Sequence, residues 1–309
     1  MDNLLIRFSK NGLKENQAYL KNYLNTTISN FKNSKVRYYY KSCLNQGIEF
    51  SVTQTLAEFE TKPLIQLYSL LNLVKFYILA NETNRNITLA EVEKKFAAHG
   101  ASEDGIDGLE LRKNGTAFEF ANILRQSYTP KQKIKLIDLY KRIPDFAISL
   151  KKLNLTSEKS DFKKIEYPVD YCFCDGTLFV KNFEMYRGEI DDKSDIFAKY
   201  NNFSDKTKDN DTFIASLNED KDKFLKKLSF DINGNYYLDT NINNGFCELF
   251  VIYLIFLKYS LLSRYKPNSW YKKLQEKENV IIEYVMDNLF EKFWALITKD
   301  LCKFEKCIL

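Results

Sequence analysis

Lys62-Pro-Leu-Ile-Gln-Leu-Tyr-Ser-Leu-Leu-Asn-Leu-Val-Lys-Phe-Tyr-Ile-Leu-Ala80 contains the strongest structural signal in this chain. Pro63 marks the start of a helix, because the first helical residue needs no backbone N–H. From there to Ala80, apolar side chains cover nearly the whole circumference, which is typical of a helix buried on all sides. Each Leu or Ile that such a helix buries contributes ~1.5–3 kcal/mol. The stretch therefore predicts the central helix of a core.

A second segment of the same character runs from Phe246 to Leu262. Its uninterrupted apolar run, Leu249 to Leu257, is much shorter than the ~20 residues that a membrane span needs, and Glu248 and Lys258 flank it. We expect the two apolar helices to pack together and to join both ends of the chain in one core. Such packing would bring His99 close to Arg264-Tyr265, which follow the helices in sequence.

Three hairpins are predicted between the helical blocks. Asn114-Gly115 is a typical two-residue turn and places a hairpin near 109–120. Asp175-Gly176 and Asn233-Gly234 place two more near 170–181 and 230–239. The polar segment 191–222 is dense in Asp, Lys and Asn and reads as a loop or a mobile insertion.

The expected class is therefore α+β and predominantly helical, with a small inserted antiparallel β element. Residues 1–155 form a helical part with a hairpin, 156–244 a β-rich and polar insertion, and 245–309 the helices that complete the core. We expect these parts to make one compact body.

Composition excludes several classes of function. The 309 residues carry a net charge of only +5, dispersed along the chain, so no concentrated basic face marks a nucleic-acid partner. Six cysteines without a C-x-x-C pair and a single histidine make no zinc site, and we predict no bound metal. No phosphate-binding glycine pattern is present, and no cofactor is predicted. The absence of a leader sequence at Met1 favours the cytoplasm.

Three islands of sequence resemble the YaaC-like family of bacterial proteins. They comprise the helix from Lys62 with Ala98-His99-Gly100 and Arg112-Lys113-Asn114-Gly115, then Ile143-Pro144-Asp145, and finally Leu262-Ser-Arg-Tyr-Lys-Pro-Asn-Ser-Trp270. The middle third, about 155–245, matches poorly. The family has no agreed activity. The resemblance implies a bacterial lineage and an association with defence and mobile-element genes.

The sequence pattern of the helix from Tyr68 to Lys75 also resembles that of HEPN-type helical domains, many of which are ribonucleases. In those domains an Arg precedes a His by a few residues, and the pair acts on the 2′-hydroxyl and phosphate. Here Lys94 takes the place of that Arg before His99 and lacks its planar fork. A ribonuclease would therefore need His99 with Lys94, or with a distant Arg such as Arg112 or Arg264.

His99 is the candidate catalytic residue, because the chain has no other histidine for acid–base chemistry near neutral pH. Its place at a helix C-terminus favours the protonated form, but that place also suits a capping residue. Arg112 and Lys113 would form a basic hairpin tip that either holds phosphate or is simply solvated.

Five further residues are candidate binding residues with equally plain structural alternatives. Asn72 and Lys75 interrupt an interior helix, so each is either paired or reaches an opening. Arg264-Tyr265 and Trp270 flank Pro267, where they either stack on a base or lock the helix end to its neighbour.

The function expected first is non-enzymatic: a recognition or scaffold protein that binds a protein or nucleic-acid partner in a bacterial defence or mobile-element system. Self-association stays open. The alternative is a metal-independent, HEPN-related ribonuclease that uses His99. A sensor with a small-molecule pocket beside His99 and Asn72 is a third possibility.

Overall fold

The computed structural model describes residues 12–146, 149–155, 162–165, 170–174, 177–181, 203–209, 212–217, 228–232, 236–239 and 245–302. The chain divides into two units, one of Met1–Ile143 with Phe246–Leu309 and one of Pro144–Gly245. The two helical blocks thus share a unit. The domain bounds at residues 155 and 245, and the single compact body, stay predictions.

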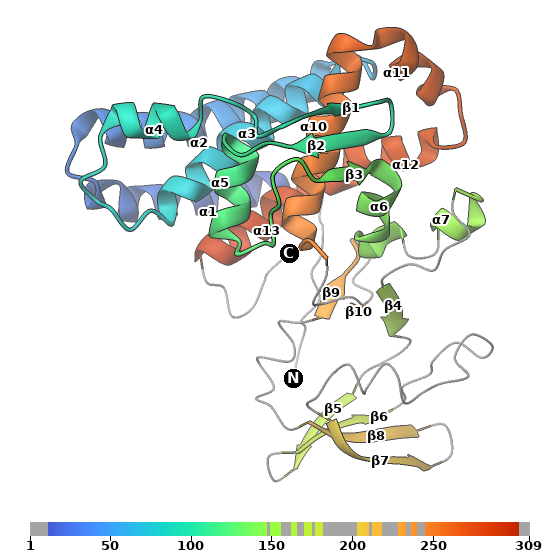
Figure 1. Cartoon of the computed structure of the whole chain (residues 1–309). Helices are drawn as coiled ribbons and strands as arrows, with labels where there is room; N and C mark the ends of the chain where they lie inside the picture. Colours follow the sequence, from blue (N-terminus) through green and yellow to red (C-terminus); the bar gives the residue numbers. More distant parts are fainter. Residues whose placement is uncertain are drawn as a thin grey trace. The chain divides into compact units, whose positions relative to one another are not determined.

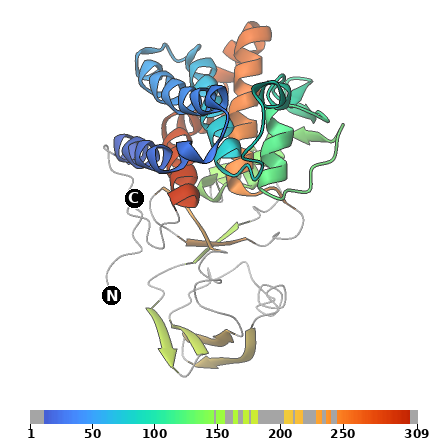
Figure 2. The ribbon, with the colours of Figure 1, turned by 90° about the vertical axis from the view of Figure 1, so that its left-hand side faces the viewer.

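Five long helices build the first unit: α1 (Gly12–Thr27), α2 (Ser34–Thr53), α3 (Lys62–Ala80), α10 (Glu248–Tyr265) and α13 (Phe290–Cys302). Helix α3 contacts α2, α10 and α13, while α1 packs on α13. In Figures 1 and 2 these helices pack against one another, so the N-terminal and C-terminal helical blocks form one bundle. The predicted packing of the two apolar helices is confirmed.

Burial follows the apolar pattern closely. The consecutive residues from Phe250 to Leu257 on α10 are each 0% exposed, as are Leu70 and Leu73 on α3. By length and composition α3 is long and apolar enough to cross a membrane, but 72% of its apolar window is buried inside the protein. Its apolar surface is therefore covered by neighbouring helices.

Shorter helices complete the first unit: η1 (Ile28–Asn30), η2 (Gln54–Leu56), α4 (Leu89–Lys95), α5 (Thr116–Ile123), α6 (Leu136–Lys141), α11 (Pro267–Leu274) and α12 (Asn279–Tyr284). A single π-helical stretch, η4 (Val285–Leu289), joins α12 to α13. The side chain of Gln66 on α3 donates a hydrogen bond of 2.5 Å to the carbonyl of Met286 within η4. The predominantly helical α+β class is confirmed.

The predicted hairpin near 109–120 is wrong. Strand β2 (Gly108–Leu111) pairs with β1 (Ala101–Asp104) and β3 (Lys133–Lys135) in an antiparallel sheet of order β1-β2-β3. Gly115, at φ +96°, leads into helix α5 instead of a second strand. Ala117, Phe120 and Ala121 then face the core at helical spacing.

In the second unit the other two hairpins are confirmed. Strand β5 (Asp170–Cys174) pairs with β6 (Thr177–Lys181), and β9 (Leu228–Phe230) pairs with β10 (Tyr236–Asp239), all antiparallel. Strand β4 (Phe162–Ile165) adds to β10. The turns of both hairpins lie outside the described residues. Two short helical pieces, η3 (Pro144–Phe146) and α7 (Ser149–Lys152), precede the strands.

The expectation that 191–222 is only a loop or mobile insertion is wrong in part. Strands β7 (Phe203–Asp209) and β8 (Thr212–Leu217) pair antiparallel within it. The run Thr212-Phe-Ile214 is rich in β-branched and aromatic residues, which suits a strand despite the polar surroundings. The rest of 191–222 lies outside the described residues.

Candidate functional site

His99 lies in the connection between α4 and β1, and backbone hydrogen bonds fix this connection. The N–H of Ala117 donates to the His99 carbonyl at 2.9 Å, and the N–H of Arg112 donates to the Gly100 carbonyl at 2.8 Å. A Cβ on Gly115 would lie 2.4 Å from a backbone oxygen of the same connection. The close approach of the two backbones therefore requires a glycine there and holds His99 in place.

The electrostatic surroundings of the half-buried His99 lower its pKa from the ordinary 6.5. Burial is the largest cause, followed by the positive charges of Arg264 and Lys75. The expected preference for the protonated form is wrong, because α4 ends at Lys95, four residues earlier, and two cations replace the helix terminus as neighbours. A neutral imidazole is favoured.

Lys75 and Asn72 lie on the same side of α3, because residues three apart share a helix face. The Nζ atom of the half-buried Lys75 is 5.8 Å from the centroid of the Phe96 ring. Among the described residues Lys75 has no hydrogen-bond acceptor and no carboxylate partner. Asn72 is buried, and its side-chain amide donates to the Tyr68 carbonyl at 2.9 Å. Of the two alternatives for Asn72, the structure therefore shows pairing within the fold.

Arg264 and Tyr265 end α10 on the surface. The guanidinium carbon of Arg264 lies 4.9 Å from the Tyr265 ring centroid, and Tyr265 is 61% exposed. Within the described residues Arg264 forms no ion pair. We name Lys75, His99 and Arg264 the basic cluster. These residues come from segments that are distant in sequence, and the charges of Lys75 and Arg264 both lower the pKa of His99.

The remaining predicted site residues, Arg112, Lys113 and Trp270, are not part of the basic cluster. Arg112 and Lys113 are exposed; Arg112 Nε donates to Ser102 Oγ at 3.0 Å, and among the described charges neither contributes to the pKa of His99. Trp270 is 1% exposed, and its indole Nε1 donates to the Glu60 carbonyl at 2.9 Å. It therefore locks the end of α10 and offers no surface to a ligand.

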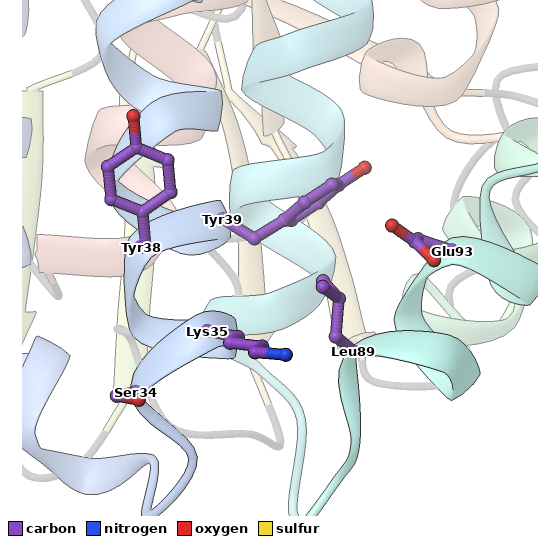
Figure 3. Close-up of a pocket in the computed structure, with 6 residues that line it drawn as sticks. All are labelled: Ser34, Lys35, Tyr38, Tyr39, Leu89 and Glu93. Carbon is purple, nitrogen blue, oxygen red and sulfur yellow. The ribbon is translucent and has the colours of Figure 1, made fainter.

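An open pocket of about 320 Å³ lies between the start of α2 and α4, as Figure 3 shows. Its lining residues are Ser34, Lys35, Tyr38, Tyr39, Leu89 and Glu93. The Tyr39 ring stacks on Phe96 with centroids 6.3 Å apart, and Phe96 in turn lies under Lys75. The pocket therefore adjoins the basic cluster. Sequence reasoning missed it, although the run Tyr38-Tyr39-Tyr40 was a visible signal.

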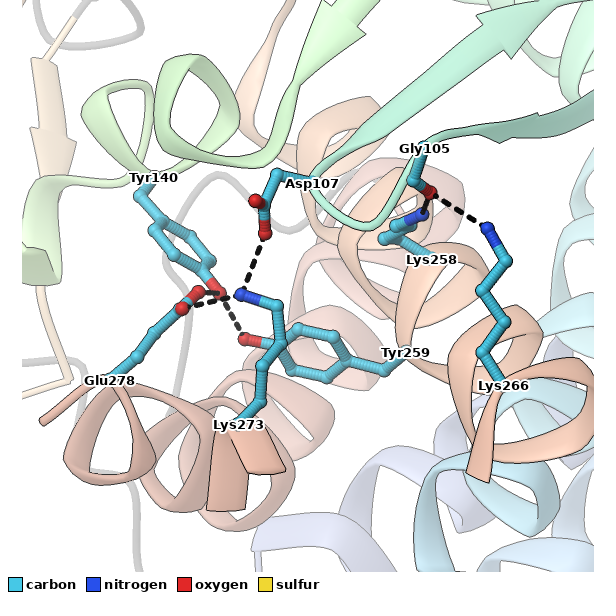
Figure 4. Close-up of polar contacts among 8 residues, drawn as sticks. All are labelled: Gly105, Asp107, Tyr140, Lys258, Tyr259, Lys266, Lys273 and Glu278. Atoms are coloured by element: carbon cyan, nitrogen blue, oxygen red, sulfur yellow. Dashed lines mark hydrogen bonds and ion pairs between the residues drawn. The ribbon is translucent and has the colours of Figure 1, made fainter. Parts of the chain in front are cut away.

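A second group of polar side chains in the helical unit, built around the buried Tyr140, Tyr259 and Lys273, also escaped prediction (Figure 4). The hydroxyls of Tyr140 and Tyr259 lie 2.5 Å apart, and Tyr140 donates to Glu278 at 2.8 Å. Lys273 Nζ lies 2.6 Å from Glu278 and 2.7 Å from Asp107. We name these five residues the tyrosine–lysine cluster. Each of its charges faces an opposite charge, and burial raises the pKa of both tyrosines well above 10.

Lys258 and Lys266 hold the turn between β1 and β2. Both donate to the Gly105 carbonyl, at 2.9 and 3.4 Å, and Lys266 also pairs with Glu103 at 3.3 Å. Lys258 is 0% exposed, and burial lowers its pKa to about 8. The sequence signal was a lysine inside an otherwise apolar helix. These two lysines are engaged in the fold, whereas among the described residues neither Lys75 nor Arg264 has a carboxylate partner.

Comparisons with known proteins support the resemblance to the YaaC-like family. No curated protein and no solved structure matches the chain. The model of the YaaC-like protein family matches residues 8–301, which include every element of the basic cluster and of the sheet beside it. The chain therefore belongs to the YaaC-like family.

Proposed function

We propose that the protein is a non-enzymatic recognition or scaffold protein of a bacterial defence or mobile-element system, and that its basic cluster contacts a protein or nucleic-acid partner in the cytoplasm. The observation that carries the proposal is the absence of any carboxylate partner for Lys75 and Arg264 among the described residues, although both act on one imidazole. Unneutralised cations held together on a folded surface attract an anionic partner.

A metal-independent ribonuclease is the second candidate, and one observation favours it. Arg264 lies close enough to His99 to lower its pKa, so a neutral imidazole and a guanidinium share the site. In such a reaction His99 would accept the proton of the 2′-hydroxyl as the 2′-oxygen attacks phosphorus. The bond from phosphorus to the 5′-oxygen would break, the 5′-oxygen would take a proton from water, and a 2′,3′-cyclic phosphate would remain. Arg264 and Lys75 would stabilise the charge on the phosphate.

Crosslinking in bacterial cells tests the recognition function. Wild-type protein is compared with Arg264→Glu and with Lys21→Glu, which reverses an exposed charge on α1 away from the cluster. We expect one crosslinked partner to be retained by wild type and Lys21→Glu and lost from Arg264→Glu. Crosslinks that are identical in all three proteins would contradict the proposal.

Incubation of purified protein with total RNA separates the two candidates. The non-enzymatic function predicts no cleavage by wild type or by His99→Ala. Cleavage by wild type that disappears in a folded His99→Ala variant would establish the ribonuclease instead.

A further inference from the structure

We propose that the partner of the basic cluster is a single-stranded nucleic acid, with Lys75 and Arg264 against backbone phosphates and Tyr265 stacked on a base. The inference rests on the proposed recognition function and names the class of partner.

The distribution of charge points to phosphates. The two cations that lower the pKa of His99 come from two helices, Lys75 from α3 and Arg264 from α10. Among the described residues, no carboxylate counteracts their effect on His99. Lys273 in the same unit is instead matched by Asp107 and Glu278. A local excess of positive charge in a chain of small net charge supplies the electrostatic attraction on which nucleic-acid binding depends.

Exposed aromatic rings accompany these cations. Tyr265 is 61% exposed and carries the Arg264 guanidinium 4.9 Å from its centroid. On the other side of Lys75, Phe96 stacks on Tyr39, which lines the pocket together with the 76% exposed Tyr38. Proteins that bind single strands combine cations that follow the backbone with rings on which bases stack.

This alternation favours a single strand over the other anionic partners. A duplex keeps its bases stacked on one another, so it would use the cations and leave Tyr265 and Tyr38 without a role. An acidic protein segment would likewise need the charges alone. Unpaired bases, by contrast, use both the cations and the exposed rings.

Binding of fluorescein-labelled 20-nucleotide oligo(dT) and oligo(U) to untagged protein, followed by anisotropy, tests the proposal. A 20-base-pair duplex serves as the competing ligand. We expect the single strands to bind more tightly than the duplex. Tyr265→Ala should weaken single-strand binding by about 5- to 100-fold, the range for loss of one stacked base. Arg264→Gln and Lys75→Gln should each flatten the logarithmic salt dependence by about 0.7.

Lys21→Glu is the matched control and should bind as wild type, and circular dichroism verifies that each variant is folded. The single histidine provides an independent readout, because its ring resonances report His99 alone. They should move when oligo(dT) is added. Absence of binding, duplex preference, or equal binding by wild type and both glutamine variants would overturn the proposal. If a crosslinked protein partner nevertheless depends on Arg264, the nucleic-acid inference fails and the recognition function stands; if neither partner is found, both fail.

Discussion

The basic cluster and the tyrosine–lysine cluster both depend on α10 and use cations of the same kinds, yet their surroundings are opposite. Lys273 contacts two carboxylates within 2.7 Å, whereas Lys75 lies over the Phe96 ring and has no carboxylate partner among the described residues. Burying a charge is unfavourable unless the charge is paired, so the first arrangement stabilises the fold. The second leaves positive charge available to something outside the chain. Pairing with carboxylates separates the structural cation Lys273 from the cations that we propose contact a partner.

Glu278→Ala should produce the largest effect on stability. It removes the carboxylate that joins Lys273 to Tyr140, and breaking a buried ion pair leaves the remaining charge uncompensated. Because Asp107 still faces Lys273, we expect the free energy of unfolding to fall by about 3 kcal/mol, the lower end of the range for such pairs. Denaturant unfolding measures it.

The control for this variant is Glu276→Ala, an exposed residue two positions away, which should change stability by no more than about 0.5 kcal/mol. Equal effects of Glu278→Ala and Glu276→Ala would show that the buried pairing contributes nothing.

Lys258→Met should change how stability depends on pH. Burial holds the Lys258 pKa at about 8 in the folded state, against an ordinary 10.5; Glu103 and Asp107 raise it, and Lys266 and Lys273 lower it. Between pH 8 and 10 the unfolded chain therefore binds more protons at this lysine, so its contribution to stability increases as pH rises. Wild type should gain stability relative to Lys258→Met from pH 8 to pH 10. Parallel unfolding curves for the two proteins across that range would exclude the depressed pKa.

The sequence could predict those features of the two clusters that depend on local patterns, but not those that depend on contacts between segments far apart in sequence. The apolar circumference of α3 and α10 is a local pattern, and it predicted both the core and the approach of Arg264 to His99. The turn at Asn114-Gly115 was equally local but misleading, because Gly115 is needed for close contact with the connection that carries His99. Glycine is required in both cases, so the residue type alone could not distinguish them.

The tyrosine–lysine cluster could not be predicted, because its members come from segments far apart in sequence. Tyr140 and Tyr259 are separated by 119 positions, and nothing local to either indicates the other. Lys258, which holds the turn at Gly105 and is not a member of this cluster, was visible as a charge inside an apolar helix. The basic cluster was easier to predict because its residues follow the ends or interrupt the faces of the two helices that the sequence identified.

Removal of a binding cation should have little effect on stability. Lys75→Met and Arg264→Met delete charges that have no carboxylate partner among the described residues, so we expect each to change the free energy of unfolding by less than about 1 kcal/mol. Measurement beside Glu278→Ala under identical conditions makes the contrast direct. A loss from Arg264→Met as large as that from Glu278→Ala would place Arg264 in the fold rather than in a binding site.

The smallest effect is a change in the pKa of His99, and it tests whether the basic cluster is a unit. Because Arg264 and Lys75 both disfavour the imidazolium, Arg264→Met and Lys75→Met should each raise the pKa of His99, Arg264→Met by more. Burial remains in both variants, so neither should restore the ordinary 6.5 fully. Titration of the single histidine by NMR measures the change without overlap from other histidines.

The lowered pKa of His99 also determines how the stability of the protein changes with pH. The folded state binds the His99 proton less tightly than the unfolded chain, so wild type loses stability as pH falls from above 6.5 through the lowered pKa. Arg264→Met should make this acid loss smaller. A bound polyanion should act in the same direction as that substitution, because a phosphate beside His99 offsets the two positive charges and raises its pKa. If neither substitution changes the pKa of His99, the three residues do not share a site. The contrast between the tyrosine–lysine cluster and a partner-binding basic cluster would then no longer hold.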